Sequence, residues 1–180
     1  MKFLIASDLH GSAYYTRQLV SAFASEAADR LILLGDILYH GPRNDLPRDY
    51  APKEVIALLS PLKDRILCVR GNCDTEVDQM VLPFPLMADY AVMPVGKRLC
   101  YMTHGHVFNN AHLPPLVPGD MLLHGHTHVP ACQEHPTHVY LNPGSVSLPK
   151  EGSPHGYMTL EDGAFLWKDF DGNVYNEYRV

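Results

Sequence analysis

The stretch Phe3-Leu4-Ile5-Ala6-Ser7-Asp8-Leu9-His10 places a short apolar run directly before an acidic residue and a histidine. A short, continuous apolar run is typical of a strand that is buried on both faces. Two further runs of this kind follow, at 31–34 and 66–69, and each leads into a glycine with a polar residue beside it. The first third of the chain therefore predicts three buried strands, each ending at a polar turn.

Helical patterns separate these three runs. Residues 14–28 carry apolar side chains at helix spacing, and residues 52–62 form a second candidate helix with Pro52 in its first turn, where proline is tolerated. The order β-α-β-α-β favours parallel strands that are buried on both faces.

The second half of the chain predicts mainly β structure. Gly, Pro and Asp-Gly turns separate short strand-like segments, and Asp162-Gly163 is typical of a hairpin turn. The expected strands are 88–95, 98–103, 121–123, 138–141, 157–160, 164–167 and 174–178. Two sheets packed face to face, with helices outside, accommodate both halves in an α/β fold, and we expect residues 1–180 to form a single domain.

Composition excludes some classes of function. The formal net charge is −6 and there is no run of basic residues, so we find no strong nucleic-acid signal. No stretch approaches the ~18 apolar residues of a membrane span. The four cysteines form no C-x-x-C pair and no disulfide framework, which favours a reducing, cytoplasmic location. Histidine is unusually frequent, with eleven residues against fourteen Lys plus Arg.

Chemistry-bearing residues cluster just after the predicted strands. Since ligands bind beyond the carboxyl ends of strands in α/β sheets, five strands deliver polar groups to one rim. The clusters are Asp8 with His10, Asp36, Asn72 with Asp74, His104 with His106, and His124 with His126 and His128. Carboxylate, amide and imidazole ligands together suit divalent transition metals, and a pair of such ions can clamp a phosphoryl group. Asp36, alone at its strand end, is the candidate for a bridging carboxylate.

Each cluster alone also has an ordinary structural explanation. Asp-x-His can cap a helix, Gly-Asp is a routine turn, and His104 to His106 can be a polar loop. The segment Gly125-His126-Thr127-His128 gives a stronger signal, because alternate residues of an extended segment share a face; a solvated loop is its alternative. Five polar strand ends of this composition together favour a metal centre.

The same clusters, in this order, resemble the calcineurin-like metallophosphoesterases, and in particular small bacterial and archaeal phosphodiesterases of the YfcE type. The resemblance spans residues 3 to about 150 and includes Asn142-Pro143-Gly144-Ser145. It implies a four-layer α/β/β/α sandwich and two divalent metal ions, commonly Mn²⁺. It implies that a metal-bridging hydroxide attacks phosphorus. One metal would be held by Asp8, His10, Asp36 and His128, and the other by Asp36, Asn72, His104 and His126.

One position departs from the resemblance. Many relatives carry a histidine near the leaving group where this chain has Cys73, and a thiol with an ordinary pKa of about 8.5 is a poor replacement. The YfcE-type branch shares this cysteine, so activity is not excluded. His106 is a second candidate proton donor, with a solvated or outer position as its alternative. Asp74 is expected to orient a ligand rather than to bind metal.

The loop from Tyr39 to Asn44 follows Asp36 and supplies candidate substrate contacts. Arg43 and Asn44 are the residues that we expect to bind a substrate phosphate, although a surface arginine is an equal alternative for Arg43. Ser145 is a weaker candidate, because it also fits an ordinary turn.

Three functions remain open from sequence. The first is metal-dependent hydrolysis of a small phosphodiester, with Asp36, Asn72, Cys73 and His106 in the catalytic centre; the second is a phosphomonoesterase. The third is a non-catalytic scaffold like the retromer subunit that resembles this family, which lacks some metal-site residues. An apolar patch for a partner or a second copy of the chain could include Phe84, Leu86, Tyr90 and Phe108, which core packing explains equally well.

Overall fold

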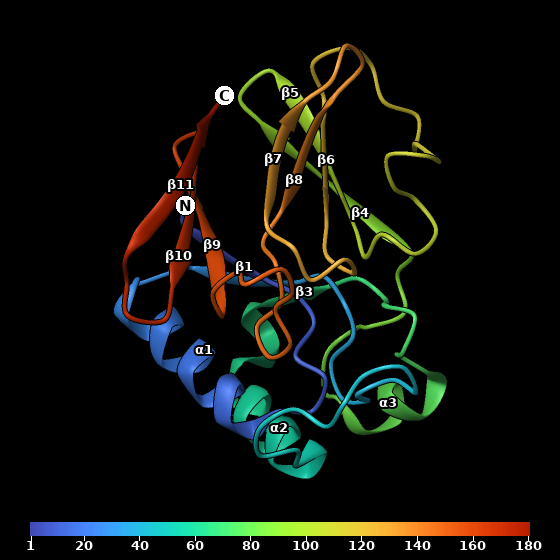
Figure 1. The fold of residues 1–180 in the computed structure, drawn as a ribbon, viewed down its shortest axis with the longest axis vertical. Coiled ribbons are helices and arrows are strands. Elements are labelled where there is room, and N and C mark those ends of the chain that lie inside the picture. The colour runs from blue at the N-terminus through green and yellow to red at the C-terminus, as the bar shows by residue number, and fades with distance from the viewer.

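The computed structural model describes all residues, 1–180 (Figure 1). Three α-helices, one 3-10 helix and eleven strands follow one another along the chain. They are β1 (Phe3–Ala6), α1 (Ala13–Ser25), β2 (Arg30–Leu33), α2 (Pro52–Leu59), the 3-10 helix η1 (Ser60–Arg65), β3 (Ile66–Cys68), α3 (Glu76–Val81), β4 (Tyr90–Val95), β5 (Arg98–Thr103), β6 (Met121–His124), β7 (Ala131–Glu134), β8 (Val139–Asn142), β9 (Gly156–Glu161), β10 (Ala164–Asp169) and β11 (Val174–Arg179).

The strands form two mixed sheets. The first has the order β11-β10-β9-β1-β2-β3, and the second has the order β4-β5-β6-β8-β7. In the first sheet β1, β2 and β3 are parallel, with Ile5 opposite Ile32 and Ile32 opposite Leu67. After the second sheet the chain returns as β9, which pairs antiparallel with β1. Both ends of the chain therefore belong to one sheet.

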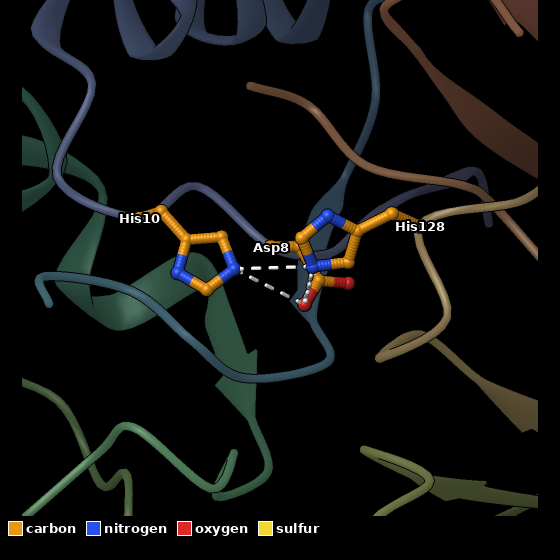
Figure 2. Close-up of side chains that lie close together, drawn as sticks. All are labelled: Asp8, His10 and His128. Atoms are coloured by element: carbon orange, nitrogen blue, oxygen red, sulfur yellow. Dashed lines mark hydrogen bonds and ion pairs between the residues drawn. The ribbon is translucent and has the colours of Figure 1, made fainter. Parts of the chain in front are cut away.

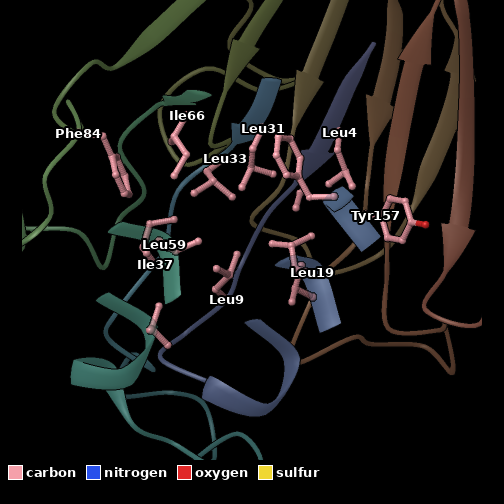
Figure 3. Packing of buried hydrophobic residues seen from close by; sticks show 14 of the residues in the cluster. Leu4, Leu9, Leu19, Leu31, Leu33, Ile37, Leu59, Ile66, Phe84 and Tyr157 are labelled. Atoms are coloured by element: carbon pink, nitrogen blue, oxygen red, sulfur yellow. The ribbon is translucent and has the colours of Figure 1, made fainter. Parts of the chain in front are cut away.

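Side chains alternate between two hydrophobic clusters along the central strands. Leu4 on β1 and Leu33 on β2 pack with Leu19 of α1 and Leu59 of α2 (Figure 3). Ile5 faces the other way and packs between the sheets, in a cluster that includes Trp167. Both faces of β1 and β2 are buried, as their continuous apolar runs predict.

The predicted α/β class, with two sheets face to face and helices outside, is confirmed. Helices α1 and α2 cover the outer face of the first sheet (Figure 1). On the outer face of the second sheet the neighbouring layer is segment 104–120, which contains no helix and contacts the sheet at Tyr101 and Tyr90.

The two predicted helices extend too far. The first ends at Ser25 rather than at 28, because Ala27 adopts a left-handed backbone conformation with φ of 49°. The second changes to 3-10 geometry after Leu59, where Pro61 lacks the N–H that an α-helix requires.

Two elements were not predicted. Helix α3 has a capping box between Thr75 and Asp78, a signal that the sequence does carry. Strand β7 is a short edge strand with polar residues, which periodicity does not reveal. Of the suggested apolar patch, Phe84 and Leu86 are buried in the core, whereas Tyr90 is exposed and contacts Phe108.

The longest α-helix has only 13 residues, and none of the helices combines the length and apolarity that crossing a bilayer demands. The four cysteines are all free thiols.

Candidate metal centre

The five predicted clusters meet at one edge of the two sheets. The connections that follow β1, β2 and β3 approach those that follow β5 and β6, so that residues far apart in sequence lie side by side. This edge is where the carboxyl ends of the parallel strands in both sheets lie, as the sequence predicted.

One half of the centre consists of Asp8, His10 and His128, all of them buried. The Nε2 atoms of the two histidines are 3.2 Å apart, and Figure 2 shows both rings directed toward each other above the Asp8 carboxylate. Asp8 Oδ1 lies 3.6 Å from Nε2 of His10 and 3.3 Å from Nε2 of His128.

The other half consists of Asn72, His104 and His126. Nε2 of His104 lies 3.1 Å from Oδ1 of Asn72 and 3.1 Å from Nδ1 of His126. Asp36 lies between the halves, because its Oδ2 is 3.4 Å from Nε2 of His104 and 3.7 Å from Nε2 of His10. The side chain proposed as a bridge from sequence is thus the one that contacts both groups.

The imidazole rings are oriented by backbone carbonyl groups. Nδ1 of His10, His104 and His128 lies 2.7–2.8 Å from the carbonyl oxygens of Tyr39, Leu34 and Leu148, respectively. These Nδ1 atoms donate, because a carbonyl oxygen only accepts, which leaves Nε2 of each neutral ring with a free lone pair. Outer hydrogen bonds of this kind orient metal-ligating histidines.

This arrangement fits divalent metal ions. Two Nε2 lone pairs that face each other at 3.2 Å repel unless a cation or a proton lies between them. Asp8 Oδ1 is buried and has no hydrogen-bond partner, although a buried acceptor without a partner is costly. The set of carboxylate, amide and imidazole donors suits a transition metal.

Charge coupling across the centre shifts several pKa values. Burial alone would raise the pKa of Asp8, but the proximity of His10 and His128 outweighs it and holds that pKa well below its ordinary value. For His104 burial acts in the opposite direction and would lower the pKa, but the carboxylates of Asp36 and Asp8 outweigh burial and raise this pKa to about 9. In the absence of metal, protons therefore neutralise part of the buried negative charge.

Five of the clustered side chains sit on strained backbone. Left-handed φ values cost an L-residue roughly 1–2 kcal/mol each. Such values occur at Asp8 (59°), His10 (47°), Asp36 (57°), His126 (66°) and His128 (62°). Strain of this kind concentrates at functional sites.

The expectation that 125–128 is extended, with both histidines on one face, is wrong. Because His126 and His128 are both left-handed, the segment bends and the two rings diverge. His126 contacts His104 in one half of the centre, whereas His128 contacts His10 in the other.

Neighbouring residues hold these turns in place. The Asp74 carboxylate accepts hydrogen bonds from the backbone N–H groups of Asp36, Ile37 and Gly71, at 2.7–2.9 Å. Asp74 thus orients the turn that carries Asp36. At Gly71 a Cβ atom would lie 2.1 Å from Oδ1 of Asp36, so no larger residue fits.

Ser145 does not face the cleft. It is fully buried, and its hydroxyl donates to the Asp8 carbonyl at 2.9 Å. Ser147 makes the same contact at 3.0 Å. Both serines therefore support the strained turn at Asp8, and no local sequence pattern indicates this role.

The two candidate proton donors contact different members of the centre. Cys73 donates its backbone N–H to Oδ1 of Asp36 at 2.8 Å, and its nearly buried thiol has a pKa raised by burial and by that carboxylate. The His106 ring lies at a tilt of 59° to the His104 ring, with ring centroids 5.4 Å apart, and burial lowers the pKa of His106. The structure places His106 beside the clustered donors rather than among them.

A cavity of about 410 Å³ opens above the centre. Its wall includes Asp36, Asn72 and Cys73, and also both residues expected to contact substrate, Arg43 and Asn44. The amide of Asn44 donates to the His40 carbonyl at 2.8 Å and so closes its own loop. Lys150 also lines this cavity, and sequence reasoning missed it because no motif surrounds it.

Two sheets that direct buried carboxylates and imidazoles to one rim define a metal-dependent hydrolase of the α/β sandwich class. The sequence matches the calcineurin-like phosphoesterase superfamily domain over residues 1–162, and the chain belongs to this superfamily. It is accordingly a phosphoric ester hydrolase.

Individual relatives agree with this assignment. The chain is 44% identical to phosphodiesterase YfcE of Escherichia coli K12 over 162 residues, which cover 90% of this chain and 88% of that protein. The solved structure of the E. coli phosphoesterase YfcE superimposes with a TM-score of 0.95, at 40% identity and 99% coverage of both chains. Vacuolar protein sorting 29 of Cryptosporidium parvum shares the fold, with a TM-score of 0.59 at 20% identity, over 99% of this chain and 98% of that one.

Proposed function

We propose that this protein is a metal-dependent phosphodiesterase that hydrolyses a small phosphodiester at a dinuclear centre. The observation that carries the proposal is the position of Asp36 Oδ2 between Nε2 of His10 and Nε2 of His104. A carboxylate placed in this way can hold two cations at the separation of ~3.5–4 Å that phosphoryl transfer uses. The 44% identity to a protein named a phosphodiesterase supports the choice of substrate class.

Each ion would have four protein donors, with Asp36 shared. Asp8, His10 and His128 would complete one site, and Asn72, His104 and His126 the other. Two divalent cations held there, Mn²⁺ in our proposal, would lower the pKa of bound water to supply a hydroxide nucleophile and would offset the charge of the phosphoryl oxygens.

The remaining residues position the substrate and the centre. Arg43 and Asn44 line the cavity on a loop whose Gly41 lies beside Cys73, and we propose that both side chains contact a substrate phosphate. Asp74 and Ser145 keep the turns of Asp36 and Asp8 in their strained conformations.

Proton donation to the leaving group is weak in this centre. The raised pKa of Cys73 makes its thiol a poor acid. The lowered pKa of His106 leaves its ring neutral near pH 7, so it must capture a proton before it can donate one. We therefore expect the enzyme to favour good leaving groups, such as the phenolates of activated diesters.

A direct comparison of chromogenic substrates tests the proposal. Bis(p-nitrophenyl) phosphate and p-nitrophenyl phosphate share a leaving group and differ in being a diester and a monoester. With Mn²⁺ present we expect kcat/KM to be at least about tenfold higher for the diester, a difference of ~1.4 kcal/mol. A preference for the monoester would establish the phosphomonoesterase instead.

Further properties rest on the same proposal. Because β1 and β9 pair within one sheet, we propose that residues 1–180 fold as a single domain. The cytoplasmic location and the possible homo-oligomer remain predictions from sequence. The scaffold function has no support here, because every proposed ligand position holds a competent side chain that faces the centre.

A further inference from the structure

Two cationic side chains line the cavity above the metal centre, and they come from different loops. Arg43 belongs to the loop 40–44 after β2, and Lys150 belongs to the loop between β8 and β9. The two residues are separated by more than a hundred positions in sequence, yet both face the same space of about 410 Å³.

Both loops are fixed to the metal centre itself. The backbone N–H of Lys150 donates to the His128 carbonyl at 3.1 Å, and the carbonyl of Lys150 accepts from the N–H and the hydroxyl of Ser153, at 3.0 and 2.6 Å. On the other side Gly41 packs against the thiol of Cys73. The backbone of each loop is therefore anchored beside the centre, and both side chains line the cavity above it.

Neither cation is neutralised by its own chain. Arg43 and Lys150 take part in no side-chain hydrogen bond and no ion pair, whereas Lys2 and Lys168 both pair with Glu26 at 2.7 Å. Two unpaired cations on one cavity wall attract anions into that cavity, even though the net charge of the chain is −6.

The cavity wall also limits what an organic substituent can be. Apart from Cys73 and Pro42, it consists of glycine and of polar or charged residues. Ligand sites usually hold an uncharged substituent against hydrophobic and aromatic side chains, which this wall lacks.

The reacting phosphodiester needs only part of this positive charge. It carries one negative charge, and in the proposed function the two metal ions already face its phosphoryl oxygens. Resting on that function, we propose that the physiological substrate is a phosphodiester with a second phosphate group on one ester arm, which Lys150 binds while Arg43 contacts the reacting phosphodiester. Lys150 is then a specificity-determining residue for this second phosphate.

A matched pair of substrates tests the assignment. Thymidine 5′-(p-nitrophenyl phosphate) and its 3′-phosphorylated form differ only in the additional phosphate. With Mn²⁺ and at low salt, we expect the phosphorylated substrate to show about tenfold higher kcat/KM through a lower KM, as one charge-assisted contact provides. In Lys150→Gln this advantage should fall to about twofold, and Lys150→Arg should retain most of it.

Lys97→Gln is the matched control, because Lys97 is an exposed lysine in the turn between β4 and β5, outside the cavity. It should leave the ratio unchanged. As a readout that needs no turnover, thymidine 3′,5′-bisphosphate should inhibit more strongly than thymidine 5′-phosphate in the parent enzyme, and Lys150→Gln should remove the difference.

Three outcomes would overturn the inference: equal kcat/KM for the two substrates, an advantage that persists in Lys150→Gln, or an equal loss in Lys97→Gln. Failure of the proposed function itself is a different result, because neither thymidine diester would then be hydrolysed with Mn²⁺ present.

Discussion

Two regions of this molecule bury carboxylates in opposite ways. Glu26, at the end of α1, is only 12% exposed and is surrounded by partners from its own chain: Lys2 and Lys168 at 2.7 Å and the Tyr157 hydroxyl at 3.0 Å. Asp8, at the end of β1, is fully buried, and its Oδ1 has no hydrogen-bond partner.

The pKa shifts of the two carboxylates point the same way but have different causes. Burial would raise both, yet the lysines and Tyr157 lower the pKa of Glu26 to about 2, whereas histidines lower that of Asp8. A lysine is charged at neutral pH without help, but a histidine is charged only when it binds a proton. The Glu26 cluster is thus complete in itself, whereas the Asp8 centre requires protons or metal ions.

Removal of metal should produce the largest difference between the two regions. Protein stripped with a chelator should lose its diesterase activity to background and regain it with Mn²⁺, because its own donors cannot generate the nucleophile. At free Mn²⁺ a hundredfold above Kd, the returned ion should add about 3 kcal/mol to the free energy of unfolding. Activity that is indifferent to chelation would sink the dinuclear mechanism.

Asp36→Asn should be the most damaging single substitution at the centre. The change leaves the size of the side chain almost intact but removes the charge shared by both halves, and we expect kcat to fall about 10³-fold. Arg43→Ala, which changes only a substrate contact, should cost about tenfold. Steady-state kinetics with bis(p-nitrophenyl) phosphate measures both, and comparable losses would refute the bridging assignment.

The sequence predicted where the centre lies better than it predicted how the side chains reach it. Apolar runs locate β1 and β5 at their observed bounds, since burial on one or both faces leaves a clear periodic signal. The predicted clusters also lie together as expected. The backbone of 125–128 could not be read in this way, because left-handed histidines are favoured only by tertiary contacts.

Residues that act through loops left no local pattern. Lys150 reaches the cavity because its backbone is bound to His128, and Ser145 is buried because it supports the Asp8 turn. Likewise, the helix end at Ser25 depends on a left-handed Ala27, where glycine would have been the usual signal. Such features depend on contacts between distant segments, which a single sequence does not display.

Glu26→Gln should affect stability and spare activity. At pH 7 we expect the substitution to lower the free energy of unfolding by about 2 kcal/mol, because the pKa of this side chain falls from 4.5 to about 2 on folding and part of that gain is screened. A depressed pKa stabilises above the unfolded value, so the difference between the two proteins should shrink as pH falls from about 4.5 toward 2. Urea denaturation at several pH values measures it.

The activity of the same Glu26→Gln protein distinguishes the two regions. Diesterase activity with Mn²⁺ should remain within about twofold of the parent enzyme, since Glu26 contacts no residue of the centre. A large loss of activity in a folded Glu26→Gln protein would contradict the division into a self-sufficient cluster and a metal-requiring one.

The most specific test of the comparison between the two regions concerns the proton on His104. Its pKa near 9 means that stripped protein carries this proton at pH 7, held between Nε2 and the Asp36 carboxylate. A metal ligand must be deprotonated, so Mn²⁺ binding at pH 7 should release about one proton, and the apparent affinity should fall up to tenfold per pH unit below 9. Calorimetry in buffers of different ionisation enthalpy measures the release.

His104→Gln supplies the control, because it removes the titrating group and should abolish most of the proton release along with the binding at that half of the centre. Glu26→Gln should release the same proton as the parent protein. If Mn²⁺ bound at pH 7 without proton release, the stripped centre would already hold neutral imidazoles. The carboxylates of the centre would then need neither protons nor metal ions to stay buried. In that respect they would not differ from Glu26, and the contrast between the two regions would disappear.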